Sequence, residues 1–268
     1  MNMFIATFNA NSIRARKDII QKWLNKTGCN ILCIQETKVQ DKDFPSKDFQ
    51  ELGYNCYYKG QKSYNGVAIL SKEEPNQVSY GIGDGKDSEE DQARIIRASF
   101  KDFELINVYV PQGREIDHPN FKKKLEWFRR LLDHLKNHHS PSQPLLILGD
   151  FNVAPEERDV YAPEKKKNHV CFHESVRKEF FSLLDWGLFD LFRHFNKEEK
   201  QYTFFDYRIP KSVERRLGWR IDHILVTSPV LSQAKNCYID LEPRTWPKPS
   251  DHTFLCAEFE PKLCTSNA

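Results

Sequence analysis

The chain has 268 residues, of which 39% are hydrophobic and 29% are charged, as expected for a globular protein with a large core. No stretch approaches the roughly 18 apolar residues that a membrane span requires, so no membrane partner is expected. The 40 basic and 38 acidic side chains leave a formal net charge of only +2. This balance excludes binding of a polyanion through global charge and leaves local basic patches as the alternative.

The seven cysteines are an odd number and form no Cys-x-x-Cys pair. Such usage is typical of a reducing compartment rather than of a disulfide framework. The first eight residues are too short an apolar segment, with too polar a continuation, to be a signal peptide. We therefore expect a cytoplasmic protein, associated with the nucleoid if its source is bacterial.

The first part of the chain alternates short apolar runs with one helix. Residues 3–8, 31–34 and 67–70 are predicted to be strands, because each is short and nearly continuous in apolar character. An apolar stripe at i, i+4 spacing over residues 19–24 predicts a helix that stops at Gly28. The segment 80–92 is rich in glycine and acidic residues and is expected to be a mobile loop.

The second part continues the same alternation. Strands are predicted at residues 105–110, 145–148, 221–226 and 254–259. An apolar stripe from 121 to 135 predicts a helix with Asn120 as its N-cap, and a further helix is expected over 175–186. The basic segments 159–173 and 208–218 are expected to be loops.

This interleaving predicts an α/β fold in which two sheets pack face to face with helices outside, a four-layer α/β sandwich. Several of the strands are apolar on both faces, as expected when both faces of a sheet are covered. No segment resembles an interdomain linker. Residues 1–268 are therefore expected to form one domain.

Polar side chains lie at or just beyond one end of five of the apolar runs. Strand ends and the loops after them are where a rigid sheet can bring polar groups together at one place. The shared pattern predicts one metal-dependent hydrolytic site. The segments are Phe8-Asn9-Ala10-Asn11, Gln35-Glu36-Thr37-Lys38, Gly149-Asp150-Phe151-Asn152, Arg220-Ile221-Asp222-His223 and Lys248-Pro249-Ser250-Asp251-His252.

A phosphodiester hydrolase needs a metal ion to neutralise charge and orient the phosphate. Mg²⁺ prefers carboxylate, amide and water oxygens, and it takes one or two carboxylates from the protein. Glu36 is the preferred candidate for the first ligand, with Asn9 and Asp251 as its neighbours. We expect Mg²⁺ in this site, with Mn²⁺ as a substitute.

The remaining polar residues suit the chemistry of the reaction. Asp150 is the candidate that holds the attacking water, and Asn152 faces the same way if the segment is extended. His252 can contact a phosphate oxygen, and Asp222 is the candidate that orients its imidazole. Tyr109 could donate a hydrogen bond to the phosphate or to the leaving oxygen.

Each of these residues also has a simpler explanation when it is taken alone. An Asp-x-Asn segment after a strand is more often a turn or a cap than a catalytic base. The lysine runs at 122–124 and 165–167 are typical of a solvated surface, although the second could reach phosphates. The histidines at 169 and 173 flank a cysteine, but a zinc site needs more ligands at matching spacing, so this segment is interpreted as a loop.

Together the motifs resemble the exonuclease III family of abasic-site DNA endonucleases, within the endonuclease/exonuclease/phosphatase superfamily. The similarity covers nearly the whole chain and includes the five segments above in order. It also includes Tyr58-Lys59-Gly60-Gln61-Lys62, Asn107-Val108-Tyr109-Val110-Pro111-Gln112-Gly113, Trp186-Gly187-Leu188-Phe189-Asp190-Leu191-Phe192-Arg193-His194 and Phe205-Asp206-Tyr207-Arg208.

This resemblance implies a two-sheet sandwich with its site at one edge, and Mg²⁺- or Mn²⁺-dependent cleavage 5′ to an abasic site that leaves a 3′-hydroxyl. It also implies 3′ end cleaning and 3′-to-5′ exonuclease action on double-stranded DNA that contains abasic sites or blocked 3′ ends. The matching motifs assign the metal to Glu36, the water to Asp150 with Asn152, and the orientation of His252 to Asp222. Asn9, Tyr109 and Asp251 complete the site, and Arg94 and Gln112 are expected to contact DNA.

The resemblance further places a small apolar pocket at Phe204, Trp219 and Ile221, where a turned-out sugar without a base would fit. These residues could equally be ordinary core. Phe204-Phe205 stands where some members of the family have Trp-Phe or Phe-Trp. The balance between abasic-site cleavage and exonuclease activity is therefore left open.

Two alternatives remain from the sequence. A relative that acts on inositol phosphates or sphingomyelin would share the Asn, Glu, Asp-x-Asn and Asp-His elements, although the segments 58–62, 186–194 and 219–222 favour DNA. A non-catalytic DNA-binding module is disfavoured because all the candidate catalytic side chains are present. A monomer is expected, since a duplex must reach an open face.

Overall fold

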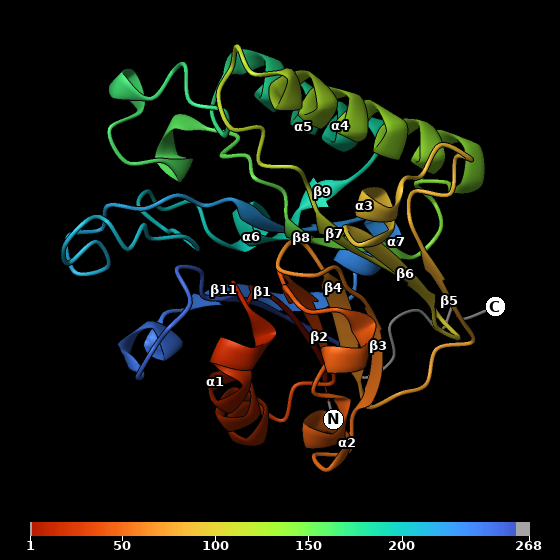
Figure 1. Ribbon diagram of the computed structural model, residues 1–268. Helices are drawn as coiled ribbons and strands as arrows, with labels where there is room; N and C mark the ends of the chain where they lie inside the picture. The colour runs from red at the N-terminus through yellow and green to blue at the C-terminus, as the bar shows by residue number, and fades with distance from the viewer. Residues whose placement is uncertain (1, 261–268) are drawn as a thin grey trace.

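The computed structural model describes residues 2–260, which form two six-stranded sheets packed face to face with helices on both outer sides (Figure 1). In Figure 1 the long helices α4 (Pro119–His138) and α5 (Glu174–Trp186) lie above the second sheet. Helices α1 (Ile13–Thr27) and α2 (Ser46–Gln50) lie below the first sheet. The four-layer α/β sandwich predicted from the sequence is confirmed.

The first sheet has the strand order β11-β12-β1-β2-β4-β3. Its central strands β1 and β2 are parallel, and its other pairs are antiparallel. The strands are β1 (Met3–Asn9), β2 (Ile31–Gln35), β3 (Asn55–Lys59), β4 (Val67–Ser71), β11 (Ala234–Asp240) and β12 (Phe254–Phe259).

The second sheet repeats this pattern with the order β5-β6-β7-β8-β10-β9, and here β7 and β8 are the parallel pair. Its strands are β5 (Gln77–Tyr80), β6 (Ile95–Ser99), β7 (Glu104–Tyr109), β8 (Leu145–Asp150), β9 (Phe189–Asp190) and β10 (Asp222–Val226). The shorter helices are α3 (Glu89–Gln92), α6 (Leu191–Phe195) and α7 (Ser228–Leu231), with 3₁₀ turns at Asp41–Asp43, Glu157–Asp159, Pro163–Lys165 and Glu242–Thr245.

Three hydrophobic clusters fill the spaces between the four layers. One lies between the sheets and joins residues such as Ile5 of β1 to Leu105 of β7. The other two pack the outer helices onto the sheets, with Trp23 of α1 in one and Phe128 of α4 in the other. Because the central strands are covered on both faces, their apolar runs are continuous rather than alternating.

Helix α1 confirms the prediction from the apolar stripe. Its residues at 19, 20, 23 and 24 are buried, and Gly28 caps its end in the left-handed conformation with φ of 66°. The predicted start of α4 was wrong. The helix begins at Pro119, and the His118 side chain accepts a hydrogen bond from the backbone N–H of Asn120 at 3.0 Å. Proline is favoured at the first helical position because its missing N–H would have no helical partner there.

The segment 80–92 is more ordered than the prediction of a loop implied. Its last four residues form α3, which Ser88 caps at its N-terminus. Arg130 of α4 forms ion pairs with Asp84, Asp87 and Asp91 at 2.7, 3.0 and 3.1 Å. The prediction of an irregular segment was therefore wrong for residues 89–92. Among residues 2–260, no helix is both long enough and apolar enough to cross a membrane.

Candidate active site

The parallel pairs at the centre of the two sheets bring their carboxyl ends to one edge of the sandwich. In the first sheet Asn9 at the end of β1 is the register partner of Gln35, which directly precedes Glu36. In the second sheet Asp150 at the end of β8 is flanked by Tyr109 on one side and by Asp222 on the other. The strand ends that the sequence pattern singled out therefore meet across the two sheets.

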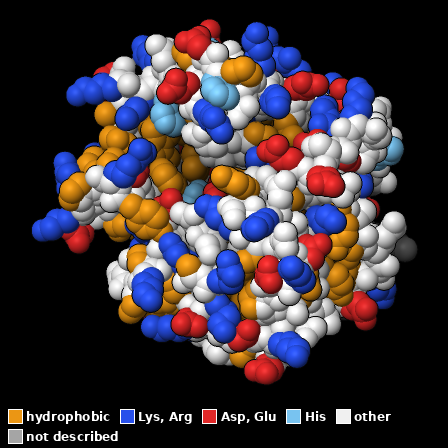
Figure 2. All heavy atoms as spheres, viewed as in Figure 1, with side chains coloured by type: hydrophobic (Ala, Val, Ile, Leu, Met, Phe, Trp, Pro, Cys, Tyr) orange, Lys and Arg blue, Asp and Glu red, His pale blue; other side chains and the backbone are white. Residues whose placement is uncertain are grey.

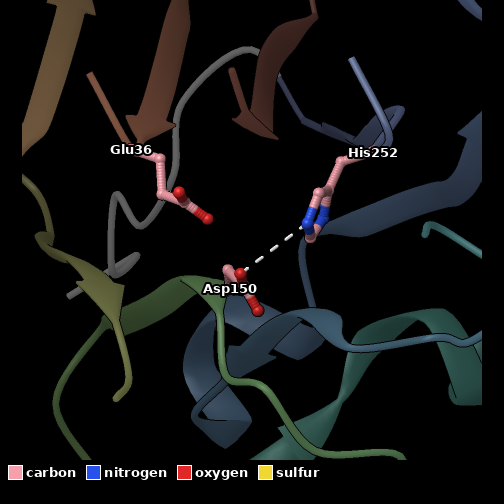
Figure 3. A group of neighbouring side chains, drawn as sticks. All are labelled: Glu36, Asp150 and His252. Atoms are coloured by element: carbon pink, nitrogen blue, oxygen red, sulfur yellow. Dashed lines mark ion pairs between the residues drawn. The ribbon is translucent and has the colours of Figure 1, made fainter. Parts of the chain in front are cut away.

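Glu36, Asp150 and His252 point toward one another from three different elements (Figure 3). Each offers a ligand atom, and these atoms all lie within 4.8 Å of one another; the described residues contain no other such group. The imidazole Nε2 of His252 lies 3.9 Å from the Asp150 carboxylate. The sequence prediction that distant segments converge on one site is consistent with this geometry.

Asn9 links the carboxylates of the two sheets. Its amide nitrogen donates to Glu36 at 2.9 Å and to Asp150 at 2.8 Å. Its side-chain oxygen accepts the backbone N–H of Asn11 at 2.9 Å. In this orientation the Asn9 nitrogen faces the two carboxylates and holds them in place, while its oxygen faces the Asn11 backbone.

A second layer of contacts surrounds Glu36. The Lys38 ammonium lies 2.7 Å from the Glu36 carboxylate and also donates to Asn11, whose amide nitrogen bonds Asp251 at 3.0 Å. Burial alone would raise the pKa of Glu36, but Lys38, Asn9 and His252 hold it below its ordinary value. Glu36 is therefore a carboxylate at neutral pH, and Asp251 is linked to it through Asn11 and Lys38.

Asp222, at the start of β10 in the second sheet, holds the imidazole of His252, which lies just before β12 of the first sheet. Its Nδ1 lies 2.8 Å from the Asp222 carboxylate, and both side chains are buried. Burial would lower the pKa of His252, but the carboxylates of Asp222, Asp150 and Asp251 raise it to about 10. His252 therefore carries a positive charge at neutral pH, with its Nε2 proton directed toward the side of Asp150.

Asp150 and Asn152 form a tight local structure after β8. One Asp150 oxygen accepts the backbone N–H of Asn152 at 2.8 Å, while the Asn152 amide donates to the Val110 carbonyl at 2.9 Å. Burial, together with the negative charges of Asp222 and Glu36, raises the pKa of Asp150 to about 7, against the opposing effect of His252. Asp150 can thus accept a proton near neutral pH.

Tyr109 and Arg94 lie next to each other at the same edge. Burial and the Glu36 carboxylate raise the pKa of Tyr109 well above its ordinary value, so its hydroxyl stays protonated as a donor. The Arg94 guanidinium lies 4.9 Å from the centre of the Tyr109 ring and pairs with Glu90 at 2.7 Å. Arg94 is 8% exposed and lines an adjoining polar groove together with Gln112.

A cavity of about 400 Å³ opens beside these groups. Phe204, Trp219, Ile221 and Gln112 line it together with the site residues, and the Phe204 ring lies 4.9 Å from the His252 ring. Figure 2 shows a hollow left of centre, bordered by hydrophobic and basic side chains. The residues for which the sequence left ordinary core as an alternative therefore form walls of the pocket.

The loop 159–173 also contributes to this pocket, which was not predicted from the sequence. His169, Cys171, Tyr161 and Lys166 all line it. The His169 ring lies 4.4 Å from the ring of Trp219, and the Lys166 ammonium lies 5.8 Å from it. The basic composition of this loop indicated that it could reach phosphates. It did not indicate that the loop would lie beside the pocket.

The interpretation of residues 122–124 as a solvated run was wrong for Lys124. Lys124 is fully buried beneath the site, and its ammonium bonds the backbone carbonyl of Asn152. It lies on the same face of α4 as Phe121 and Phe128, and this spacing is the signal that could have identified it.

Comparisons with known proteins agree with this arrangement. The model of the Endonuclease/Exonuclease/phosphatase family matches residues 6–252. Exodeoxyribonuclease III of Haemophilus influenzae is 35% identical, and the match covers 96% of this chain and all of that protein. The structure of an AP endonuclease from Archaeoglobus fulgidus is 45% identical with a TM-score of 0.92, and the match covers 96% of this chain and 99% of that one.

A further solved structure shows a relative with DNA. The 3′ phosphatase NExo from Neisseria, bound to a product DNA hairpin, is 38% identical with a TM-score of 0.90, over 96% of this chain and 99% of that one. These similarities extend along nearly the whole sequence and include the strand ends that build the site. The chain belongs to the endonuclease/exonuclease/phosphatase family.

Proposed function

We propose that this protein is a metal-dependent DNA repair phosphodiesterase that hydrolyses the backbone 5′ to abasic sites. The observation that carries the proposal is the convergence of Glu36, Asp150 and the Asp222–His252 pair beside a pocket that Phe204, Trp219 and Ile221 also line. The same site would clean blocked 3′ ends and could remove nucleotides from the 3′ end. Relatives described as exodeoxyribonuclease III, AP endonuclease and 3′ phosphatase support these three activities.

The donor set fits a divalent cation that prefers oxygen. Glu36 and Asp150 present carboxylate oxygens to the same space, and Asp251 lines the same cavity. We assign the site to Mg²⁺, with Mn²⁺ as a substitute. Glu36 is assigned as the principal ligand of the ion. A bound ion would neutralise charge on the phosphate and help to orient it.

The chain's own groups can carry the proton transfers. Asp150, whose pKa is raised to about 7, can accept a proton from a water that the Asn152 segment helps to position. His252, kept charged by Asp222, can donate to a phosphate oxygen and stabilise developing negative charge. Tyr109 supplies a further hydroxyl donor from the opposite side of Asp150.

The pocket supports selection of a nucleotide without a base. A deoxyribose that lacks its base turns out of the duplex at low cost and can enter an apolar cavity lined by Phe204, Trp219 and Ile221. Gln112 lies at the mouth between this cavity and the groove of Arg94. We therefore assign Gln112 and Arg94 to contact with the DNA strand, and Arg94 also packs against the Tyr109 ring.

The test uses a duplex with one abasic site, with Mg²⁺ or with EDTA, alongside inositol phosphate and sphingomyelin as competing substrates. We expect nicking of the duplex in Mg²⁺ and none in EDTA. Equal cleavage under both conditions would remove the metal from the mechanism. Faster turnover of inositol phosphate or sphingomyelin than of DNA would replace the proposed substrate with that of another branch of the superfamily.

We further propose that the protein acts in the cytoplasm, at the nucleoid in a bacterium, as a monomer with residues 1–268 in one domain. The six described cysteines are free, as in a reducing compartment. The site opens on a hollowed face, which a duplex must be able to reach. Sedimentation of the protein with and without duplex DNA would test the monomer.

A further inference from the structure

Lys124 of α4 is a buried cation beneath the active site. It is 0% exposed, and its ammonium donates to three backbone carbonyls. These are the carbonyls of Gln112 at 3.1 Å, Asn152 at 2.6 Å and Val170 at 2.9 Å. An ammonium has three protons, so its hydrogen-bonding capacity is filled.

The three carbonyls belong to three separate loops, and each loop contributes to the pocket. The first follows β7 and carries Gln112, the second follows β8 and carries Asn152, and the third carries Cys171 next to Val170. The second and third loops also bond each other directly, because the Ala154 N–H donates to the Cys171 carbonyl at 2.7 Å. The Lys124 ammonium is the point at which all three meet.

A buried charged side chain loses its hydration, so a lysine is a poor choice for a position that serves only to pack the helix. Neighbouring buried positions of α4 are filled by Phe121, Phe128 and Leu131, which anchor the helix without any charge. Burial lowers the pKa of Lys124, although the Asp150 carboxylate and Cys171 act in the opposite direction. A buried charge persists only where several hydrogen bonds compensate its lost hydration.

We propose that Lys124 is a positioning residue for the reaction, and that it holds the loops of Gln112, Asn152 and Val170 in one fixed arrangement. The inference rests on the roles of Asp150 and Asn152 proposed above. Because Asn152 donates its N–H to Asp150 while Lys124 holds its carbonyl, the peptide after β8 is fixed from both ends. Lys124 itself cannot contact DNA, because its side chain is buried.

The test compares Lys124→Met with Lys124→Arg and with Leu131→Ala, a buried residue of the same helix that bonds none of the loops. We expect Lys124→Met to lower kcat on an abasic duplex about 10–100-fold. This is the range found for residues that orient active-site groups without contacting the substrate themselves. The Kd for DNA, measured in EDTA, should change less than about threefold. Lys124→Arg keeps the charge and should recover a part of the loss, whereas Leu131→Ala should keep kcat close to wild type.

A second measurement is independent of activity. Hydrogen exchange followed by mass spectrometry should show faster exchange in segments 110–114, 150–154 and 169–173 of Lys124→Met, and not in Leu131→Ala. Unchanged exchange in these segments, or equal losses of kcat in the Met and Arg variants, would overturn the inference. Faster exchange with unchanged kcat would also overturn the inference, because Lys124 would then tether the loops without affecting the reaction. Failure of the proposed function would show differently, as an absence of nicking of the abasic duplex by the wild-type protein in Mg²⁺.

Discussion

The buried ion pairs of Asp159 give a direct test of how the pocket wall is held. Asp159 is fully buried and bonds the Arg220 guanidinium at 2.7 and 3.1 Å and Arg193 at 3.2 Å. Burial opposes ionisation of Asp159, but the two guanidinium groups hold its pKa below its ordinary value. Arg220 lies between Trp219 and Ile221 in the chain, so its position sets two walls of the pocket.

Replacing Asp159 with Asn should leave the two buried guanidinium groups short of negative charge. Removing one partner of a buried ion pair costs about 3–5 kcal/mol, a large part of the roughly 5–15 kcal/mol that stabilises a typical domain. Asp190 also pairs with Arg220, at 2.8 Å, and it should keep the loss toward the lower end of that range. The asparagine also replaces an acceptor of several hydrogen bonds with an amide that can donate toward the guanidinium groups.

The assay is urea unfolding of wild type and Asp159→Asn at neutral pH, followed by circular dichroism. Asp48→Asn is the matched control, because Asp48 pairs with Lys17 at 2.7 Å but both side chains are about one-third exposed. Such a pair contributes roughly 0–1 kcal/mol. Equal losses of unfolding free energy in the two variants would show that the buried Asp159 ion pairs stabilise the fold no more than the exposed pair does.

Three further predictions address the site and its surroundings. Asp150→Asn or His252→Ala should lower turnover by roughly 10²–10⁴ while DNA still binds, and a drop below about tenfold in single-turnover assays would show that other groups do the chemistry. Phe204→Ala should change the ratio of cleavage at abasic sites to digestion of intact 3′ ends, whereas an unchanged ratio would make Phe204 ordinary core. Burial and the Arg97 guanidinium lower the pKa of His134 from 6.5 to about 4, so the folded state binds this proton less readily than the unfolded state. The stability that a neutral His134 contributes is therefore greatest above about pH 6.5 and is lost as the pH falls through about 4. A His134→Gln variant should show less of this loss in urea titrations across that range.

The central strands were predictable, and several outer strands were not. The runs at β1, β2, β4 and β8 are apolar on both faces, because sheet and helix layers cover them. Strands such as β3 and β5 lie at the edges of their sheets, and all their residues are partly or fully exposed. Their polar side chains resemble those of loops, so pairing with a neighbouring strand defines them more than their own sequence does.

The site was predictable to the extent that it stands on strand ends. Glu36 and Asp150 lie at the ends of apolar runs and Asp222 lies at the start of one, and the pairing of the strands then brings them together. The contribution of the loop 159–173 was not predictable, because contacts such as that of His169 with Trp219 join residues about 50 positions apart without any strand to set their register. Lys124 was missed for a different reason. Its charge favours an exposed interpretation, and only the spacing of its helix indicated burial.

The electrostatics of the site connect its acid–base behaviour to its need for a metal. Glu36 and Asp150 come from opposite sheets, and the negative charge of Glu36 contributes to the raised pKa of Asp150. Because of that repulsion, positive charge stabilises the site, whether the charge is a proton on Asp150 or a cation between the carboxylates. Asn9, Lys38 and His252 offset part of the repulsion in the protein alone. A divalent cation would offset more of it and would lower the pKa of Asp150, so that Asp150 would be free to accept a proton from water at neutral pH.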